Sequence, residues 1–249
     1  MYNLTFISEE NFREHVSQTL KSYDESLKSI DLETFNRNII DPIKLLFDKS
    51  TFRKTFDEIL LWEIHRQRDK SNTNAIGFFH QNIFKYLKNC IVPKKGWDII
   101  VTLPKYKIYT EVKNKHNTMN AGAAQKIYIQ MQNQILNSPN DYCYLVEVIA
   151  PVSRDIAWEC SVNSHHCSHE HIRRATIDKF YSIVTGINDA FYQICMQLPK
   201  TINKLISEGK VGKIEQDTVL QELHKKSPNT LKALYLMAFE SYEGFNNLL

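Results

Sequence analysis

Two neighbouring stretches of this 249-residue chain decide its fold: Gly96-Trp97-Asp98-Ile99-Ile100-Val101-Thr102 and Lys107-Ile108-Tyr109-Thr110-Glu111-Val112-Lys113. Both show a period of two, which is typical of β-strands. Pro104-Lys105 interrupts the pattern between them, so the pair predicts an antiparallel hairpin. The second strand has one face made of Ile108, Thr110 and Val112 and an opposite face made of Tyr109, Glu111 and Lys113.

The hairpin carries a candidate catalytic site. Glu111 and Lys113 project from one face, and we expect Asp98 to lie opposite them on the first strand. Two carboxylates beside an ammonium are costly in a protein interior unless a cation lies between them. Hard oxygen ligands of this kind suit Mg²⁺, with the Val112 carbonyl as a further ligand. Lys113 would hold or deprotonate the attacking water. The alternative is a solvent-exposed strand with alternating charges.

The segment after the hairpin predicts a crossover. A helix is expected from about Ala121 to Leu136, ended by Pro139, and the apolar run Tyr142–Ile149 predicts a central strand covered on both faces. Strand, helix and strand should form a right-handed unit. The predicted fold class is α/β, a small mixed central sheet with a hairpin and a βαβ crossover, embedded in a largely helical shell.

The rest of the chain has a helical pattern. We expect helices in residues 1–60, a loop at Asp69–Asn74 before a helix from Ile76 to Leu87, and helices again from His169 onward. The later helices are expected around Ile172–Ile183 with Gly186 as the C-terminal stop, then Ile187–Leu198 ended by Pro199, Val219–His224 and Leu231–Tyr242. No linker is evident, so we predict a single domain, residues 1–249, with a core at about 56–150, N-terminal helices at 1–55 and a C-terminal helical part at 169–249.

Composition excludes several classes of protein. The chain has 31 Lys and Arg against 28 Asp and Glu and is 43% hydrophobic, which does not fit a disordered or fibrous protein. It contains neither an apolar run of membrane-spanning length nor a secretory signal, so we expect a cytoplasmic protein without a membrane partner. Its 5 cysteines are read as reduced thiols. Local motifs of serine hydrolases, P-loop enzymes and Rossmann enzymes do not occur.

Polar residues follow the catalytic strand. They can contact base edges or phosphates, although an ordinary turn that caps the next helix is the alternative. Basic residues outside this segment are further candidates for phosphate contacts. For Arg173 and Arg174 the alternative is a solvated helix face. The candidate DNA-binding residues are Asn114, Lys115, His116, Asn117, Thr118 and Asn120, together with Lys70, Arg173 and Arg174.

Asp98, Glu111 and Lys113 occupy the signature positions of the PD-(D/E)xK nuclease core, with Trp97 in place of the proline. Over about residues 45–200 the chain resembles type II restriction endonucleases of the subgroup that cuts GGNCC- or GGWCC-type sites. The stretches that carry this resemblance are Arg66–Ser71, Ile76–Gln81, Glu111–Asn120, Tyr144–Ile149 and Asp178–Tyr181.

The resemblance implies a Mg²⁺-dependent endonuclease that acts as a homodimer on short palindromic double-stranded DNA, beside a cognate DNA methyltransferase. It does not indicate which central base pair is accepted. A repair or structure-specific nuclease on the same core, and a non-catalytic DNA-binding module, are the alternatives. The intact set of Asp98, Glu111 and Lys113 argues against the DNA-binding module, because such a module has no need of metal-site carboxylates.

Three further features have two readings each. Glu63 stands where many superfamily members supply an extra metal ligand, and the alternative is a surface glutamate paired with Arg66 or Gln67. Glu147 lies in a buried strand and requires a basic partner such as Lys70, or lines the rim of the site. The residues of the Cys160–His171 patch are of the types that bind Zn²⁺, but their spacing matches no zinc-site pattern.

Overall fold

The computed structural model describes residues 2–37, 39–209 and 215–239. The chain divides into two compact units. The sheet unit lies within residues 1–20 and 75–210, and the helical unit lies within residues 21–74 and 211–249. Composition does not mark this division, because the helices α1 (Glu9–Leu27) and α4 (Phe56–Asn82) contribute residues to both units. No described helix has the length and apolar character needed to cross a membrane.

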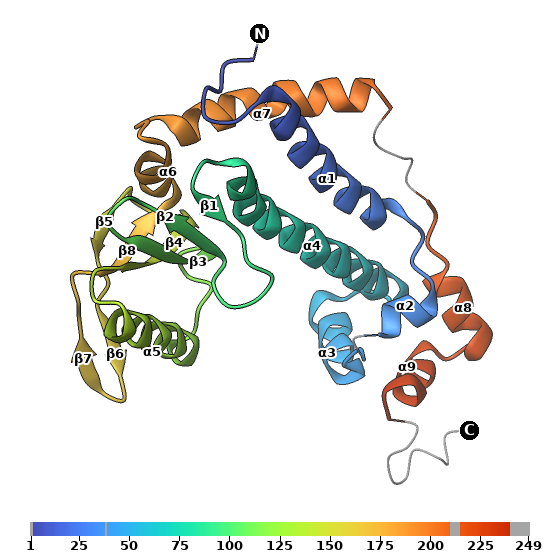
Figure 1. Ribbon diagram of the computed structural model, residues 1–249. Coiled ribbons are helices and arrows are strands. Elements are labelled where there is room, and N and C mark those ends of the chain that lie inside the picture. Colours follow the sequence, from blue (N-terminus) through green and yellow to red (C-terminus); the bar gives the residue numbers. More distant parts are fainter. Residues whose placement is uncertain (1, 38, 210–214, 240–249) are drawn as a thin grey trace. The chain divides into compact units, whose positions relative to one another are not determined.

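A mixed sheet forms the centre of the sheet unit. Among the described residues it has six strands, in the order β1-β2-β3-β4-β8-β5 (Figure 1). β2 pairs antiparallel with β3, and β3, β4 and β8 are parallel to one another. The predicted hairpin and the strand–helix–strand connection are therefore confirmed. The strands are β1 (Cys90–Ile91), β2 (Ile99–Thr102), β3 (Lys107–Lys115), β4 (Tyr142–Ile149), β5 (Asp155–Ala157) and β8 (Ile172–Thr176), and β6 (Cys160–Val162) pairs separately with β7 (His165–Cys167).

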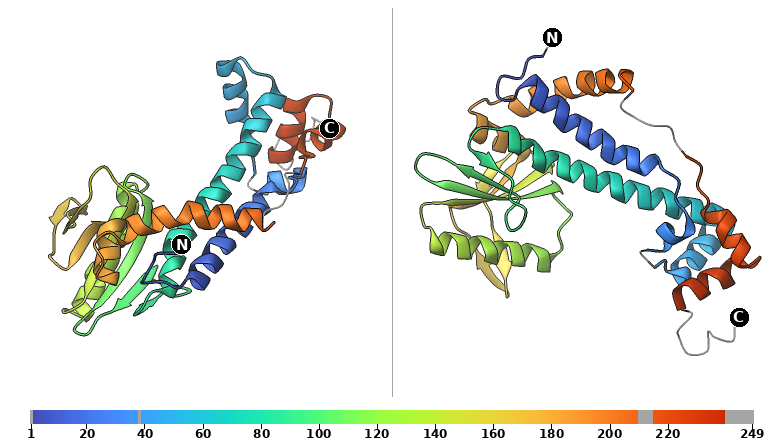
Figure 2. Two further views of the ribbon diagram at one scale, coloured as in Figure 1. Left: turned by 90° about the horizontal axis from the view of Figure 1, so that it is seen from above. Right: turned by 45° about the vertical axis from the view of Figure 1, so that its right-hand side comes forward.

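The two faces of the sheet have separate apolar cores. One face packs Val101, Ile108 and Val146 with α6 (Ile177–Thr185), α7 (Ala190–Ser207) and the 3-10 helix η1 (Ile83–Tyr86). The other face packs Cys143 and Leu145 against α5 (Ala121–Asn137). Figures 1 and 2 show α5 and α6 on opposite sides of the strands. Burial on both faces explains why β4 is apolar along most of its length.

The predicted loop at residues 69–74 is wrong, because α4 continues through it. This run is polar but contains no proline or glycine, so nothing interrupts the helical hydrogen bonds. Ser71 fits the helix by donating its hydroxyl to the carbonyl of Gln67 one turn earlier. Polarity here marks exposure and not a break.

The prediction also missed the strands between residues 155 and 176. Ile172 and Thr176 were assigned to a helix, but they lie on β8, where Ile172 and Ala175 are buried in the cores of opposite faces. Pro199 does not end its helix either, since α7 continues to Ser207 with Thr201 and Leu205 buried. Gly186 does end α6, with a left-handed φ of 73°.

The helical unit has its own core. Phe35, Leu60 and Ile64 are buried there together with Val219 and Leu223. Helices from both ends of the chain therefore share one apolar centre. Besides α4, they are α2 (Leu32–Asn36), α3 (Pro42–Phe52), α8 (Val219–Lys226) and α9 (Thr230–Phe239). The last three residues of the helix predicted to reach Tyr242 lie outside the described residues.

Candidate active site at the β2–β3 hairpin

Asp98 is fixed to the neighbouring strand immediately before β2 begins. Its backbone N–H donates to the Thr110 carbonyl at 3.0 Å, and its carboxylate Oδ2 accepts from the Val112 N–H at 2.8 Å. The Gln81 side chain on α4 donates to the Asp98 carbonyl at 3.2 Å. These bonds hold the half-buried carboxylate beside the middle of β3, where the hairpin prediction placed it.

Glu111 and Lys113 lie on one face of β3, as predicted. The Lys113 ammonium donates to Glu111 Oε1 at 2.6 Å, and both side chains are partly exposed. Because the N–H and C=O of one strand residue point to the same side, the Val112 carbonyl is directed to the same side of β3 as Asp98. We refer to Asp98, Glu111 and Lys113 as the Asp98 cluster.

The Asp98 cluster has an excess of negative charge. Burial raises the pKa of Asp98, and the charge of Glu111 raises it further, while the Val112 hydrogen bond and Lys113 act in the opposite direction. A bound cation would relieve this repulsion. Two carboxylates, with a carbonyl oxygen on the same side, fit Mg²⁺, which usually keeps several water ligands. Within the described ranges, no three His, Cys, Asp or Glu side chains gather as a metal site, so protein carboxylates alone would not complete the shell.

The segment after Lys113 is more ordered than a loop. β3 includes Asn114 and Lys115. The His116 N–H then donates to the Ile149 carbonyl at 3.0 Å, and the Thr118 hydroxyl donates to the Lys115 carbonyl at 2.8 Å. Asn120 caps α5 by accepting from the Ala123 N–H at 2.8 Å, so the helix-cap alternative describes this residue.

Other polar atoms of this segment remain available for a ligand. Lys115, Asn117 and Thr118 are exposed. Asn114 Oδ1 and His116 Nδ1 are buried without a hydrogen-bond partner among the described residues. Unsatisfied buried polar atoms are costly, and this pair lies within three residues of Lys113.

A second ionic cluster lies on the same face of the sheet. Glu147 on β4 is in register with Lys113 on the parallel strand β3, and its side chain is 0% exposed. Arg154 donates to Glu147 Oε2 at 2.7 Å, and Arg174 Nε donates to Oε1 at 3.0 Å. Burial acts to raise the pKa of Glu147, but the hydrogen bonds and charges of Arg174 and Arg154 outweigh it and hold the pKa below its ordinary value. We call these residues the Glu147 cluster.

The requirement for a basic partner of Glu147 was therefore foreseen, but Lys70 is not that partner. The sequence signal that could have identified Arg174 is the period-two pattern of β8, had that strand been recognised. Arg173 and Arg174 lie on a strand and not on the helix expected around Ile172–Ile183, so the alternative of a solvated helix face is wrong. They lie on opposite faces of β8, and Arg173 Nε donates to Asp155 at 2.8 Å.

Glu63 belongs to the helical unit and has its partners on its own helix. Arg66 Nε donates to Glu63 Oε2 at 2.6 Å, and the Gln67 amide donates to Oε1 at 3.3 Å. Its side chain is 8% exposed. The pairing with Arg66 and Gln67 that was given as the alternative describes these contacts, but Glu63 is buried and is not a surface glutamate.

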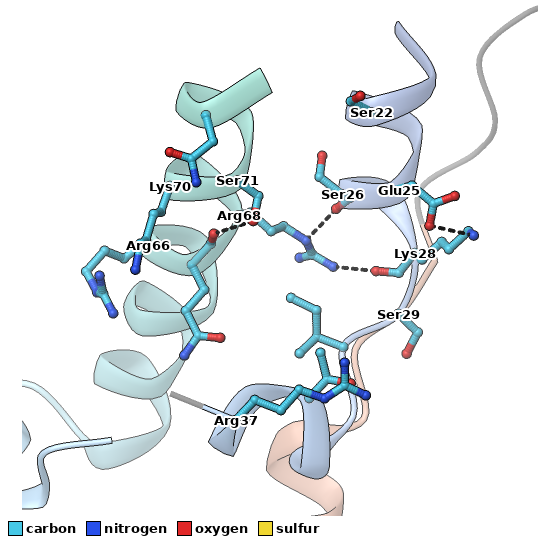
Figure 3. A pocket seen from close by; sticks show the side chains of 14 residues that line it. Ser22, Glu25, Ser26, Lys28, Ser29, Arg37, Arg66, Arg68, Lys70 and Ser71 are labelled. Carbon is cyan, nitrogen blue, oxygen red and sulfur yellow. Dashed lines mark hydrogen bonds and ion pairs between the residues drawn. The ribbon is translucent and has the colours of Figure 1, made fainter. Parts of the chain in front are cut away.

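Lys70 lines a pocket of the helical unit with a volume of about 610 Å³ (Figure 3). Arg68 braces this pocket, since it donates to the carbonyls of Ser26 and Lys28 and forms an ion pair with Asp217. Hydroxyl and cationic side chains make up much of the lining. The lining residues are Ser22, Glu25, Ser26, Lys28, Ser29, Ile30, Thr34, Arg37, Arg66, Gln67, Arg68, Lys70, Ser71 and Asn74.

The Cys160–His171 patch is largely a small hairpin. β6 and β7 pair with Cys160 opposite Cys167, and His166 opposite Ser161. Cys160 and Cys167 are free thiols, and in the described part of the chain no metal-ligating set of three forms around them. Buried Cys90 and Cys143 are also free, and burial raises the pKa of each thiol to about 12, so both are unreactive apolar side chains at neutral pH.

Comparisons with known proteins give consistent results. The sequence model of the Eco47II restriction endonuclease family matches residues 4–207. The chain is 28% identical over 232 residues to the type II restriction enzyme Sau96I of Staphylococcus aureus, covering 90% of this chain and 89% of that protein. It is 28% identical over 222 residues to the type II restriction enzyme Eco47II of Escherichia coli, covering 82% and 89% respectively. The family match includes both ionic clusters and extends beyond the predicted span of residues 45–200.

Proposed function

The chain belongs to the Eco47II restriction endonuclease family and is a type II restriction endonuclease; from this premise we propose that it uses Mg²⁺ to cut duplex DNA at a short palindromic site of the GGNCC or GGWCC type. The sheet of the sheet unit would be a PD-(D/E)xK nuclease core. The observation that carries this proposal is the Asp98 carboxylate held by the Val112 N–H at 2.8 Å beside the Glu111–Lys113 pair.

Asp98, Glu111 and the Val112 carbonyl would hold the metal ion. When bound, Mg²⁺ would polarise the scissile phosphate and lower the pKa of a bound water. Asp98 is pre-positioned for this role because its carboxylate accepts a hydrogen bond from a backbone group, the Val112 N–H, which is fixed by the strand. Glu111, which accepts from the Lys113 ammonium at 2.6 Å, would be the second carboxylate of this site. Lys113 would hold the attacking water and offset the charge that develops on the phosphate.

The exposed residues after the catalytic strand would contact DNA. Asn117 and Thr118 lie close in sequence to Lys113, so they can reach base edges near the cut phosphodiester. Lys115 would contact a backbone phosphate. Lys70, on the wall of the cationic pocket in the helical unit, would contribute a further phosphate contact.

We also propose a homodimer, since one chain carries one Asp98 cluster and a palindromic site has two strands to cut. One candidate interface is the C-terminal helical part of the chain, which has more helical surface than the core of the sheet unit requires. Exposed apolar side chains on α3 and the start of α4 offer a second surface, with Phe47 69% and Trp62 46% exposed. Sedimentation of Phe47→Asp and Met196→Asp, one substitution on each surface, would distinguish the two.

Digestion of a plasmid of known sequence in the presence of Mg²⁺ tests the proposed function. We expect discrete fragments whose ends map to one short palindrome, and no cutting in the presence of EDTA. A smear, or a preference for branched DNA, would favour a repair or structure-specific nuclease. Binding without cleavage would favour a DNA-binding module. Protection of the plasmid by a cognate methyltransferase would place the enzyme in a restriction–modification system.

A further inference from the structure

Arg174 connects three segments of the sheet unit. It lies on β8, it is paired with the buried Glu147 on β4, and its Nη2 also donates to the His116 carbonyl at 3.4 Å. His116 follows directly after β3. A single guanidinium therefore joins β4 and β8 to the backbone of the segment that follows β3.

A second hydrogen bond holds this segment at the same residue. The His116 N–H donates to the Ile149 carbonyl at the end of β4. Both backbone groups of His116 are thus held, one by β4 and one by Arg174. Farther along, Asn120 is held by its cap on α5, which leaves Asn117 and Thr118 in the short interval between two fixed points.

The cluster itself is built to resist movement. Arg154, the other partner of Glu147, is anchored through its backbone, since its N–H donates to the Thr176 hydroxyl at 3.1 Å and its carbonyl accepts from the Thr176 N–H at 2.9 Å. A planar guanidinium presents several donors in fixed directions, which an ammonium cannot do. Removing one partner of such a buried pair leaves an uncompensated charge.

We propose that Arg174 is a positioning residue, oriented by Glu147, that holds His116–Asn120 at a fixed distance from the catalytic Lys113 and so sets DNA discrimination. The proposal rests on the proposed function, because discrimination is defined by site-specific cutting. It assigns Arg174 a role different from the phosphate contact expected from the sequence. Both the guanidinium and its orientation are required, so charge alone should not suffice.

Arg173 provides a matched control, because its guanidinium is paired with Asp155 and we do not assign it the phosphate contact expected from the sequence. It is the preceding residue on the same strand, and its side chain is as exposed as that of Arg174, 24% against 26%. It is also paired with a carboxylate, that of Asp155, and additionally donates to the Asp155 carbonyl at 2.9 Å. Its contacts tie β8 to β5 on the other face of the sheet and do not involve the segment after β3.

The experiment compares Arg174→Gln, Arg174→Lys and Arg173→Gln with the wild type. It measures the affinity for cognate and non-cognate duplexes with Ca²⁺ in place of Mg²⁺, at two salt concentrations, and the single-turnover cleavage rate. The wild type is first shown to cut one site, since its failure to do so would overturn the proposed function and not this inference. Thermal melts establish that each variant is folded.

We expect Arg174→Gln to lower the ratio of cognate to non-cognate affinity about tenfold, comparable to the loss of one base contact, with non-cognate affinity and its salt dependence unchanged. Arg174→Lys keeps the charge beside Glu147 and should retain more thermal stability, yet show the same loss of discrimination. Arg173→Gln should change the ratio less than about twofold, within the range of an uncoupled surface change.

Three results would overturn the proposal. One is unchanged discrimination in both Arg174 variants. Another is an equal loss of cognate and non-cognate affinity with a weaker salt dependence, which indicates a direct phosphate contact. The third is full recovery of discrimination by Arg174→Lys. If Arg174→Gln does not fold, Arg174→Lys alone decides between these results.

Discussion

The Asp98 cluster and the Glu147 cluster lie next to each other in the sheet unit and have opposite charge balance. The first has two carboxylates and one ammonium, with Glu111 18% and Lys113 28% exposed. The second has one carboxylate, 0% exposed, between two guanidinium groups. The first therefore attracts a cation, whereas the second already contains the counter-charges of its acid. Both clusters contain acids and bases, so it is the balance of their charges that distinguishes a candidate metal site from an ion-pair cluster that holds the structure together.

The largest expected effect is on catalysis. Asp98→Asn and Glu111→Gln should each lower the cleavage rate by about 10³-fold or more, because each would remove ligand charge from the proposed Mg²⁺ site, and a metal ion supplies several kcal/mol of transition-state stabilisation. Binding to cognate DNA should change little. Single-turnover rates and gel-shift affinities measure the two properties, and near wild-type cutting by either variant would remove the Asp98 cluster from the mechanism.

The second expected effect is on stability. Glu147→Gln should lower the free energy of unfolding at neutral pH by about 3 kcal/mol, the cost of breaking a buried ion pair. The pKa of Glu147 is lowered in the folded protein, so its contribution is present above the ordinary glutamate pKa and is lost as pH falls through the folded value.

Urea denaturation at several pH values measures this effect. The difference between the wild type and Glu147→Gln should shrink as the solution becomes acidic. Arg173→Gln is the control, since it removes an ion pair that has no part in the Glu147 cluster. A difference that does not depend on pH would mean that the charge of Glu147 does not stabilise the fold.

A third effect separates base contacts from phosphate contacts. Asn117→Ala should weaken binding to cognate DNA by about 1–3 kcal/mol and leave non-cognate binding unchanged. Lys115→Ala should weaken binding to all DNA and reduce its salt dependence. If Asn117→Ala weakens cognate and non-cognate binding equally, this segment contacts the backbone and not the bases.

Asn120→Ala should act through the cap of α5 and lower the free energy of unfolding by about 1 kcal/mol.

The smallest effect concerns the stability of the catalytic site without metal. Because the pKa of Asp98 is raised in the folded protein, stability is lost as pH rises from the ordinary aspartate pKa through the folded pKa, and the ionised carboxylate weakens the fold at higher pH. Asp98→Asn keeps an oxygen for the Val112 N–H and should raise the Tm at neutral pH in EDTA by about 1–3 °C. Glu147→Gln should lower the Tm under the same conditions, and a shift of the same sign in both variants would contradict the comparison.

Local patterns were sufficient to predict the parts of the fold nearest the chemistry. The period of two placed Glu111 and Lys113 on one face, and the apolar run Tyr142–Ile149 identified the inner strand β4. The helix between them was placed within one residue of α5. Each of these elements is long and buries the same face or faces along its length, so the spacing of its apolar residues is visible in the sequence.

The remaining features depend on contacts that no local pattern records. β5, β6 and β7 have three residues each, which is too short for a period to be seen. The ion pairs of Glu147 join residues 7 and 27 positions away, and only the sheet order brings them together. α4 continues through Asp69–Asn74 because this run contains no helix-breaking residue. In the sequence, that absence is less conspicuous than the polarity of the run, which favoured a loop.

We propose that the Asp98 cluster binds the catalytic metal while the Glu147 cluster holds the surrounding structure. The decisive measurement is single-turnover cleavage of a cognate duplex as a function of Mg²⁺ concentration, for the wild type, Asp98→Asn and Glu147→Gln. We expect Asp98→Asn to remain about 10³-fold or more below the wild-type rate at every Mg²⁺ concentration. We expect Glu147→Gln to cleave with the wild-type half-saturating Mg²⁺ concentration, even if its maximal rate is lower. Cleavage by Asp98→Asn near the wild-type rate, or a loss of Mg²⁺ response in Glu147→Gln as complete as in Asp98→Asn, would contradict the claim.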